Sequence, residues 1–198
     1  MNVWVFGYGS LIWRPDFDYA ARRPARVYGW HRRFWQGSHD HRGVPHRPGR
    51  VVTLVEAANA FCDGVAYLVE RHTVDSTFEA LDHREKNGYQ RFNVELQLAG
   101  GKSTPAADES QAADFSQAAH ETAERATGVV YVAPTDNQAF LGPAPLEEMA
   151  QQILSCEGPS GRNRDYLLEL AQSLRDLDAE DPHVFELEAL VRSLEQWT

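Results

Sequence analysis

The most suggestive candidate for acid–base chemistry in this chain is Glu85, within the stretch DHREKNGYQ. The apolar spacing before it predicts a helix that ends at Gly88. A carboxylate near a helix C-terminus is disfavoured in its charged form, which would raise the pKa of Glu85 and suit it to act as a base. Arg84 and Lys86 point about 100° away from it on a helix, so Glu85 could face a sheet while they face water. A solvated glutamate at a helix end is the plainer alternative.

A second candidate is the Gly7-Tyr8-Gly9-Ser10 turn, which interrupts the apolar run VWVFGYGSLIW near the start of the chain. Glycines let backbone N–H groups converge, so such a turn can bind a carboxylate or an oxyanion. An ordinary hairpin turn, with Ser10 as a cap, explains the same residues. A dinucleotide site is disfavoured because Ile12 stands where G-x-G-x-x-G needs glycine, and no P-loop lysine follows.

No nucleophile with an evident base stands out, since the chain has neither a G-x-S-x-G elbow nor a Cys–His signature. Enzyme chemistry here would therefore need one carboxylate and a backbone cradle. The segment SHDHRGVPHRPGR (38–50) contains three histidines, but their spacing matches no standard zinc pattern. We predict no metal there; the alternatives are an ordered loop, an Arg42 that faces an anion, and a solvated turn at Pro45 and Pro48. Cys62 and Cys156 lie far apart without a C-x-x-C pair, which predicts two buried thiols.

The charge distribution points to a small anionic ligand. The 198 residues carry a formal net charge of −10, which argues against nucleic acid as the main partner. Residues 20–50 nevertheless hold eight arginines against one acid, Asp40, and this local excess suits an anion pocket. No apolar run approaches the ~20 residues needed to span a bilayer, and no signal peptide is evident, so we expect a cytoplasmic protein without a membrane partner. The oligomeric state is left open.

The element pattern predicts one α+β domain over residues 1–198 whose strands curl into a small barrel. Residues 99–126, rich in alanine, serine, glutamine and glutamate, predict a surface insertion, and residues 143–198 a helical C-terminal part. Strands are predicted at 2–6, 25–38, 49–57, 61–70, 89–98 and 127–134, with a hairpin across 58–60. Helices are predicted at 73–88, 145–157, 162–177 and 182–196.

Taken together, six stretches resemble the ChaC-type γ-glutamylcyclotransferases, in particular their glutathione-specific branch. They are WVFGYGSLIW, RRFWQGSHDHRGVPHRPGRVVTLVE, GVAYLVE, LDHREKNGYQ, FLGPAPLEEMAQQI and GPSGRNRDYLLELAQSLR. The resemblance implies a small mixed β-barrel with flanking helices and cleavage of glutathione to 5-oxoproline and cysteinylglycine without a cofactor. Related alternatives are a cyclotransferase for other γ-glutamyl peptides or amines, and a non-catalytic γ-glutamyl-binding module.

The resemblance also implies roles for individual residues. Glu85 would be the general base, Arg42 an anion contact and Tyr131 a hydroxyl donor to the substrate. The turn would hold the γ-glutamyl group through Gly7, Tyr8, Gly9, Ser10 and Leu11. The substrate's own α-amine would be the nucleophile, which fits the missing serine or cysteine nucleophile. Two departures from the family pattern are Asn87, where many members have a second glycine, and the length of the 99–126 segment.

Overall fold

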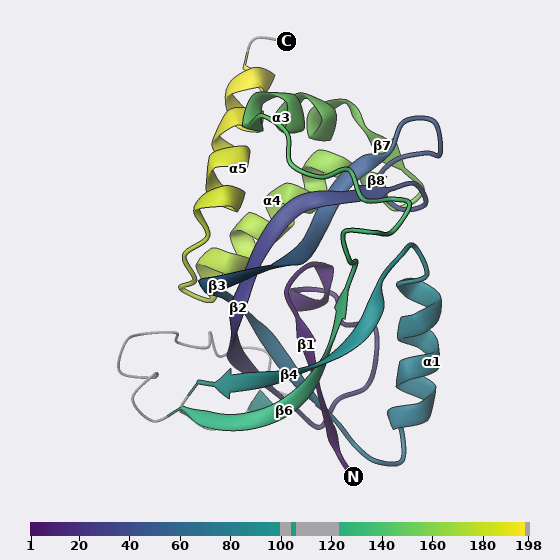
Figure 1. Cartoon of the computed structure of the whole chain (residues 1–198), viewed down its shortest axis with the longest axis vertical. Helices are drawn as coiled ribbons and strands as arrows, with labels where there is room; N and C mark the ends of the chain where they lie inside the picture. Colours follow the sequence, from purple (N-terminus) through teal and green to yellow (C-terminus); the bar gives the residue numbers. More distant parts are fainter. Residues whose placement is uncertain (100–103, 106–122, 197–198) are drawn as a thin grey trace.

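Five strands close into a barrel in the structure, a computed structural model that describes residues 1–99, 104–105 and 123–196 (Figure 1). They are β1 (Val3–Gly7), β2 (Ala21–Ser38), β3 (Gly49–Val69), β4 (Gln90–Leu98) and β6 (Glu124–Val132). Their order is β3-β1-β6-β4-β2, and pairing of β2 with β3 closes the ring. β1 is parallel to β6, while the other neighbours are antiparallel. The predicted α+β class with a small mixed barrel is confirmed.

β2 and β3 form one long antiparallel ribbon that extends beyond the rest of the barrel (Figure 1). The hairpin predicted across residues 58–60 is therefore wrong, because β3 passes through them as a single strand of 21 residues. These residues include no glycine or proline to turn the chain, and β2 is long enough to pair with both halves. The ribbon is irregular at Gly29 instead, where a φ of 83° coincides with a register shift between Tyr28 and Trp30.

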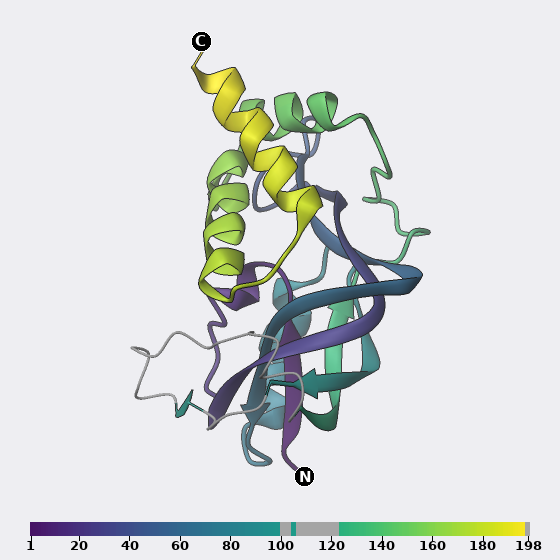
Figure 2. The same cartoon turned by 90° about the vertical axis from the view of Figure 1, so that its left-hand side faces the viewer.

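Three helices pack on one another and on the β2–β3 ribbon (Figures 1 and 2). They are α3 (Leu146–Ser155), α4 (Asn163–Asp176) and α5 (Pro182–Glu195), close to the predicted positions. Their buried faces and the barrel interior share one core, which includes Phe6, Phe34, Tyr67, Leu167 and Leu170. Burying such side chains stabilises the fold by about 1.5–3 kcal/mol each, so the helical layer and the barrel support each other.

The remaining helix, α1 (Val74–Arg84), lies away from these three, on the other side of the barrel (Figure 1). Leu81 anchors it in a second apolar cluster with residues of β1 and β6. The helix ends earlier than predicted: Glu85 is its C-cap and donates its N–H to Leu81 O at 2.8 Å. Gly88 follows at a φ of 88°, so the chain turns away and leaves Glu85 at the barrel.

Most of the segment predicted as a surface insertion, 99–126, falls outside the described residues. Its described parts belong to the sheet: β5 (Thr104–Pro105) pairs with the start of β2, and β6 begins at Glu124, earlier than predicted. Within the described part of the chain, no helix is both long and apolar enough to cross a membrane.

The contact between α5 and β2 depends on a neutral histidine. His183 Nε2 accepts a hydrogen bond from the main-chain N–H of Phe34 at 3.1 Å. Burial, with a smaller contribution from Arg33, lowers the pKa of His183 to about 4. An unfolded histidine titrates near ~6.5, so the unfolded chain binds more protons between these values. We therefore expect the free energy of unfolding to fall as the pH drops from about 7 to about 4.5.

Urea unfolding at the two pH values measures this loss. His183→Gln keeps a hydrogen-bond acceptor but cannot titrate, so it should reduce the difference between the two unfolding free energies. His72→Gln is the matched control, because the His72 side chain is 75% exposed, and should keep the full difference. An undiminished pH dependence in His183→Gln would contradict the assignment.

Candidate active site

In the turn after β1, residues 8–11, the main-chain carbonyls accept hydrogen bonds from other protein groups, whereas three main-chain N–H groups have no described acceptor. Arg32 Nε donates to Tyr8 O at 2.7 Å, and the Tyr67 hydroxyl to Leu11 O at 2.7 Å. Inside the short 3₁₀ turn η1 (Ser10–Ile12), Gly9 O accepts from Ile12 N–H at 2.9 Å and Ser10 O from Arg14 N–H at 2.8 Å. No described residue accepts a hydrogen bond from the N–H of Gly9, Ser10 or Leu11. These three amides are thus available to a ligand.

Close packing explains why two positions of the turn are glycine. A Cβ on Gly7 would lie 2.7 Å from Leu11 Cβ. A Cβ on Gly9 would lie 2.9 Å from the Tyr166 hydroxyl and 3.0 Å from a methyl group of Val52. The turn could not fold this tightly with larger residues, so the glycines are needed for close approach of neighbouring side chains.

Glu85 supplies a largely buried carboxylate beside this turn, with a side chain only 18% exposed. Burial raises its pKa, Arg84 lowers it, and the negative charge of Asp40 raises it further. The direction agrees with the sequence prediction, but burial is the main cause.

Arg84 corrects one part of the sequence interpretation, because it faces the site and not bulk water. Its Nε lies 3.4 Å from Glu85 Oε1, and its guanidinium donates to Ser10 Oγ at 2.8 Å and to Arg14 O at 3.0 Å. The rotation of about 100° between successive helical residues does not apply to this pair, because Glu85 is the C-cap, beyond the last helical residue. Arg84 therefore links the end of α1 to the turn.

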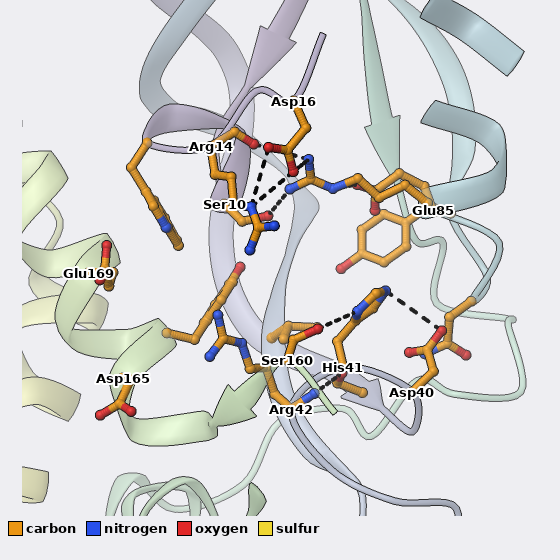
Figure 3. A pocket seen from close by; sticks show the side chains of 17 residues that line it. Ser10, Arg14, Asp16, Asp40, His41, Arg42, Glu85, Ser160, Asp165 and Glu169 are labelled. Carbon is orange, nitrogen blue, oxygen red and sulfur yellow. Dashed lines mark hydrogen bonds and ion pairs between the residues drawn. The ribbon is translucent and has the colours of Figure 1, made fainter. Parts of the chain in front are cut away.

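Two cavities meet at Glu85. A small one of about 40 Å³ is lined by the turn from Tyr8 to Leu11, and a larger one of about 530 Å³ opens towards α4 (Figure 3). Ser10, Glu85, Tyr89 and Tyr166 line both of them. Gly7 lines neither and supports the turn from behind. A ligand that fills both cavities would pass directly by the Glu85 carboxylate.

The larger cavity contains one arginine without an acidic partner. Arg14 and Arg84 are paired with Asp16 at 3.0 and 3.3 Å. Arg42 instead donates to the main-chain oxygen of Arg162 at 3.2 Å, and no acid among the described residues forms an ion pair with it. Figure 3 shows Arg42 across the cavity from Asp16. It is therefore the cation best placed to meet an anionic ligand.

The histidine-containing loop is ordered by hydrogen bonds to the turn between α3 and α4. His41 Nδ1 lies 2.9 Å from Ser160 Oγ, and Ser160 N–H donates to His41 O at 2.9 Å (Figure 3). Ser38 Oγ accepts from the Arg42 N–H at 2.9 Å and so fixes the start of the loop. No group of three or more His, Cys, Asp or Glu side chains in the described residues could hold a metal ion. Cys62 and Cys156 are buried free thiols.

Tyr131 does not fit its predicted role as a hydroxyl donor. Its side-chain hydroxyl donates to Asp82 Oδ1 at 2.7 Å, so this proton is already used outside the site. The main-chain oxygen of Tyr131 instead accepts from the Tyr8 hydroxyl at 2.8 Å, so Tyr131 supports the turn through its backbone. It borders the small cavity in this way.

The sequence alone did not identify two tyrosines that line the site, or the contacts that Asn87 makes beside it. Tyr89 donates from its hydroxyl to Val52 O at 2.7 Å, and Tyr166 projects from the first turn of α4. Periodicity alone marks both as ordinary partly apolar positions, so no sequence signal identified them. Asn87 Nδ2 donates to Gly37 O at 2.9 Å, and Asn87 O accepts from Gln36 Nε2 at 2.9 Å. Asn87 thus fastens the segment after Glu85 to β2.

Comparison with known proteins places the chain in a family. A family model described as ChaC-like protein matches residues 3–194. Glutathione-specific gamma-glutamylcyclotransferase 1 of Danio rerio is 40% identical over 192 residues, which cover 95% of this chain and 88% of the relative. Gamma-glutamylcyclotransferase 2-3 of Arabidopsis thaliana is 40% identical over 198 residues, which cover 98% and 90%. The crystal structure of a gamma-glutamyl cyclotransferase specific to glutathione from yeast has a TM-score of 0.82 at 31% identity, covering 97% of this chain and 96% of that one. The chain therefore belongs to the ChaC-like protein family.

Proposed function

We propose that this chain is a glutathione-specific γ-glutamylcyclotransferase that converts glutathione to 5-oxoproline and cysteinylglycine. The observation that carries the proposal is the buried carboxylate of Glu85 beside three unpaired amides, at the junction of the two cavities. The names of the relatives point to the same reaction.

The two cavities suit the two parts of the substrate. The small cavity, lined by the turn, receives the γ-glutamyl arm. The larger cavity, at about 530 Å³, lies within the ~300–1,000 Å³ typical of small-molecule sites and receives the cysteinylglycine part. The scissile amide then lies between the cavities, next to Glu85. Arg42 is the proposed contact for the glycine carboxylate.

The reaction needs a neutral amine and a folded γ-glutamyl arm. The substrate α-ammonium first gives a proton to Glu85, whose raised pKa makes it a better acceptor than an ordinary glutamate. The freed amine attacks the γ-carbonyl carbon and closes a five-membered ring. Well-oriented intramolecular attack can have an effective molarity of ~10⁵ M or more, so holding the arm in this geometry supplies much of the rate.

The free amides of the turn stabilise the negative charge that develops on the γ-carbonyl oxygen. Each such donor typically lowers the barrier by about 3 kcal/mol. Collapse of the intermediate breaks the bond to the cysteinyl nitrogen, and Glu85 returns its proton to that nitrogen. The attack leaves the ring nitrogen with a second proton to lose, and this proton also passes through Glu85 to the released amine, which departs as an ammonium. One C–N bond forms and one breaks, two protons move from the α-ammonium to the cysteinyl nitrogen, and no water is consumed, so the proposed cycle needs no cofactor.

Product analysis tests the reaction and its substrate range. Purified protein without added metal should form equal amounts of 5-oxoproline and cysteinylglycine from glutathione, measured by mass spectrometry, and much less product from γ-Glu-Ala. EDTA should leave the rate unchanged, and a loss of rate would require a metal in the cycle. Equal turnover of γ-Glu-Ala would favour a broader γ-glutamylcyclotransferase. Binding of glutathione without 5-oxoproline would favour the non-catalytic binding module.

Replacing the proposed base separates chemistry from folding. Glu85→Gln should lower kcat by ~10²–10⁴-fold because an amide cannot accept the ammonium proton, while thermal unfolding stays similar. Glu79→Gln, at an exposed position of α1, is the matched control and should keep full activity. In the wild type, kcat/KM should rise with pH as Glu85 loses its proton, with a midpoint above the usual glutamate pKa of ~4.3. Retained turnover in Glu85→Gln would place the base elsewhere.

The proposed carboxylate contact predicts a binding defect. Arg42→Met should raise KM for glutathione about tenfold with little change in kcat, because the glycine carboxylate is remote from the bond that breaks. A glycyl ester of glutathione, which lacks that charge, should show almost the same KM with the wild type and the variant. Arg125→Met, whose side chain is 79% exposed on β6, is the control. If the ratio of the variant KM to the wild-type KM were similar for glutathione and its ester, the glycine carboxylate would be bound by another residue.

A further inference from the structure

Arg32 is a buried arginine that donates one hydrogen bond to the turn and two to residues outside it. The residue is only 2% exposed. Its Nε donates to Tyr8 O at 2.7 Å, Nη1 to Asp181 Oδ2 at 2.7 Å, and Nη2 to Asp63 O. Arg32 lines neither cavity, so it would not touch a ligand there.

The hydrogen bond to Tyr8 O determines where the next amide points. The described chain contains no cis peptide bond, so the carbonyl of Tyr8 and the N–H of Gly9 point in opposite directions from one peptide plane. With the carbonyl fixed towards Arg32, the N–H of Gly9 faces away from it. Gly9 lines the small cavity, and no described residue accepts from its N–H. A charged donor on the carbonyl also polarises the peptide and strengthens its N–H as a donor.

We propose that Arg32 is a positioning residue: it orients the Tyr8–Gly9 peptide so that the Gly9 N–H binds the developing γ-carbonyl oxyanion. This inference rests on the proposed cyclotransferase reaction. The guanidinium suits this role better than an ammonium, because its planar fork holds three acceptors in fixed directions at once.

Arg32 links the turn to Asp63 on β3 and to Asp181, the N-cap residue of α5. A buried ion pair contributes little net stability, since desolvation offsets most of the attraction. Asp181 neutralises Arg32 and also caps α5, accepting from the Val184 N–H at 3.2 Å. The turn is thereby fixed relative to both β3 and the N-cap residue of α5.

Arg50 provides a matched control for burial and charge. It is 6% exposed and donates to Phe34 O at 2.9 Å, to Gly142 O at 3.2 Å and to Gln152 Oε1 at 2.6 Å. Like Arg32 it holds main-chain carbonyls, but none of them belongs to the turn, and it lines neither cavity.

Steady-state kinetics on glutathione test the proposal with the wild type, Arg32→Lys, Asp181→Asn and Arg50→Lys. Arg32→Lys should lower kcat ~10–100-fold with KM within about threefold of the wild type, because the lost interaction forms only in the transition state. The pH midpoint assigned to Glu85 should not move. Arg50→Lys should lose comparable thermal stability but keep kcat within about twofold.

Asp181→Asn keeps Arg32 and an oxygen for the α5 cap, so it remains informative if Arg32→Lys does not fold. It should lower kcat about threefold to tenfold at nearly constant KM. Three outcomes would overturn the positioning role: an unchanged kcat in a folded Arg32 variant, a defect confined to KM, or an equal loss of kcat in Arg50→Lys. In each case, turnover by the wild type would leave the proposed function intact. No 5-oxoproline from the wild type would overturn the proposed function, and the inference with it.

Discussion

The site depends on one constraint: the backbone of the turn has satisfied carbonyls and unsatisfied amides. Buried backbone groups are almost always paired, so three free N–H groups beside a cavity are unusual unless a ligand completes them. The four carbonyls from Tyr8 to Leu11 are bound by Arg32, Ile12, Arg14 and Tyr67. Because every carbonyl is already held, rotation of the peptide planes is restrained, and the three unpaired amides belong to residues that line the small cavity.

The same logic applies to the carboxylate of Glu85, the proposed base. Burial makes the charged form of Glu85 costly, and Arg84 at 3.4 Å limits this cost. The balance leaves the pKa of Glu85 raised, which suits its proposed role as a base that later acts as an acid. Arg84 also donates to Ser10 Oγ, so the residue that tunes the base is the one that ties it to the turn. Arg84 thus contributes to both the pKa and the position of Glu85.

The barrel class, the turn, Glu85 and the C-terminal helices could be predicted because each has a local signal. Alternating apolar residues mark strands, glycines mark the turn, and Gly88 marks the end of the segment that carries Glu85. The errors arose where tertiary contacts override local ones. Residues 58–60 continue a strand because β2 supplies a partner, and the Tyr131 hydroxyl is taken by Asp82. Tyr89, between α1 and β4, and Tyr166, on α4, join the site only because the tertiary fold brings both to the same two cavities.

Asn87 shows how this chain holds its base from both sides. Arg84, on the helix side of Glu85, bonds to the turn, and Asn87, on the other side, exchanges two hydrogen bonds with β2. A glycine at this position has no side chain to donate to Gly37 O, so the segment from Glu85 to Tyr89 would keep only its main-chain contacts. In an intramolecular reaction the rate depends on keeping the amine, the carbonyl and the base aligned, and misplacement by about 1 Å can cost ~10²-fold. The two hydrogen bonds of Asn87 therefore hold the segment where the proposed reaction needs alignment.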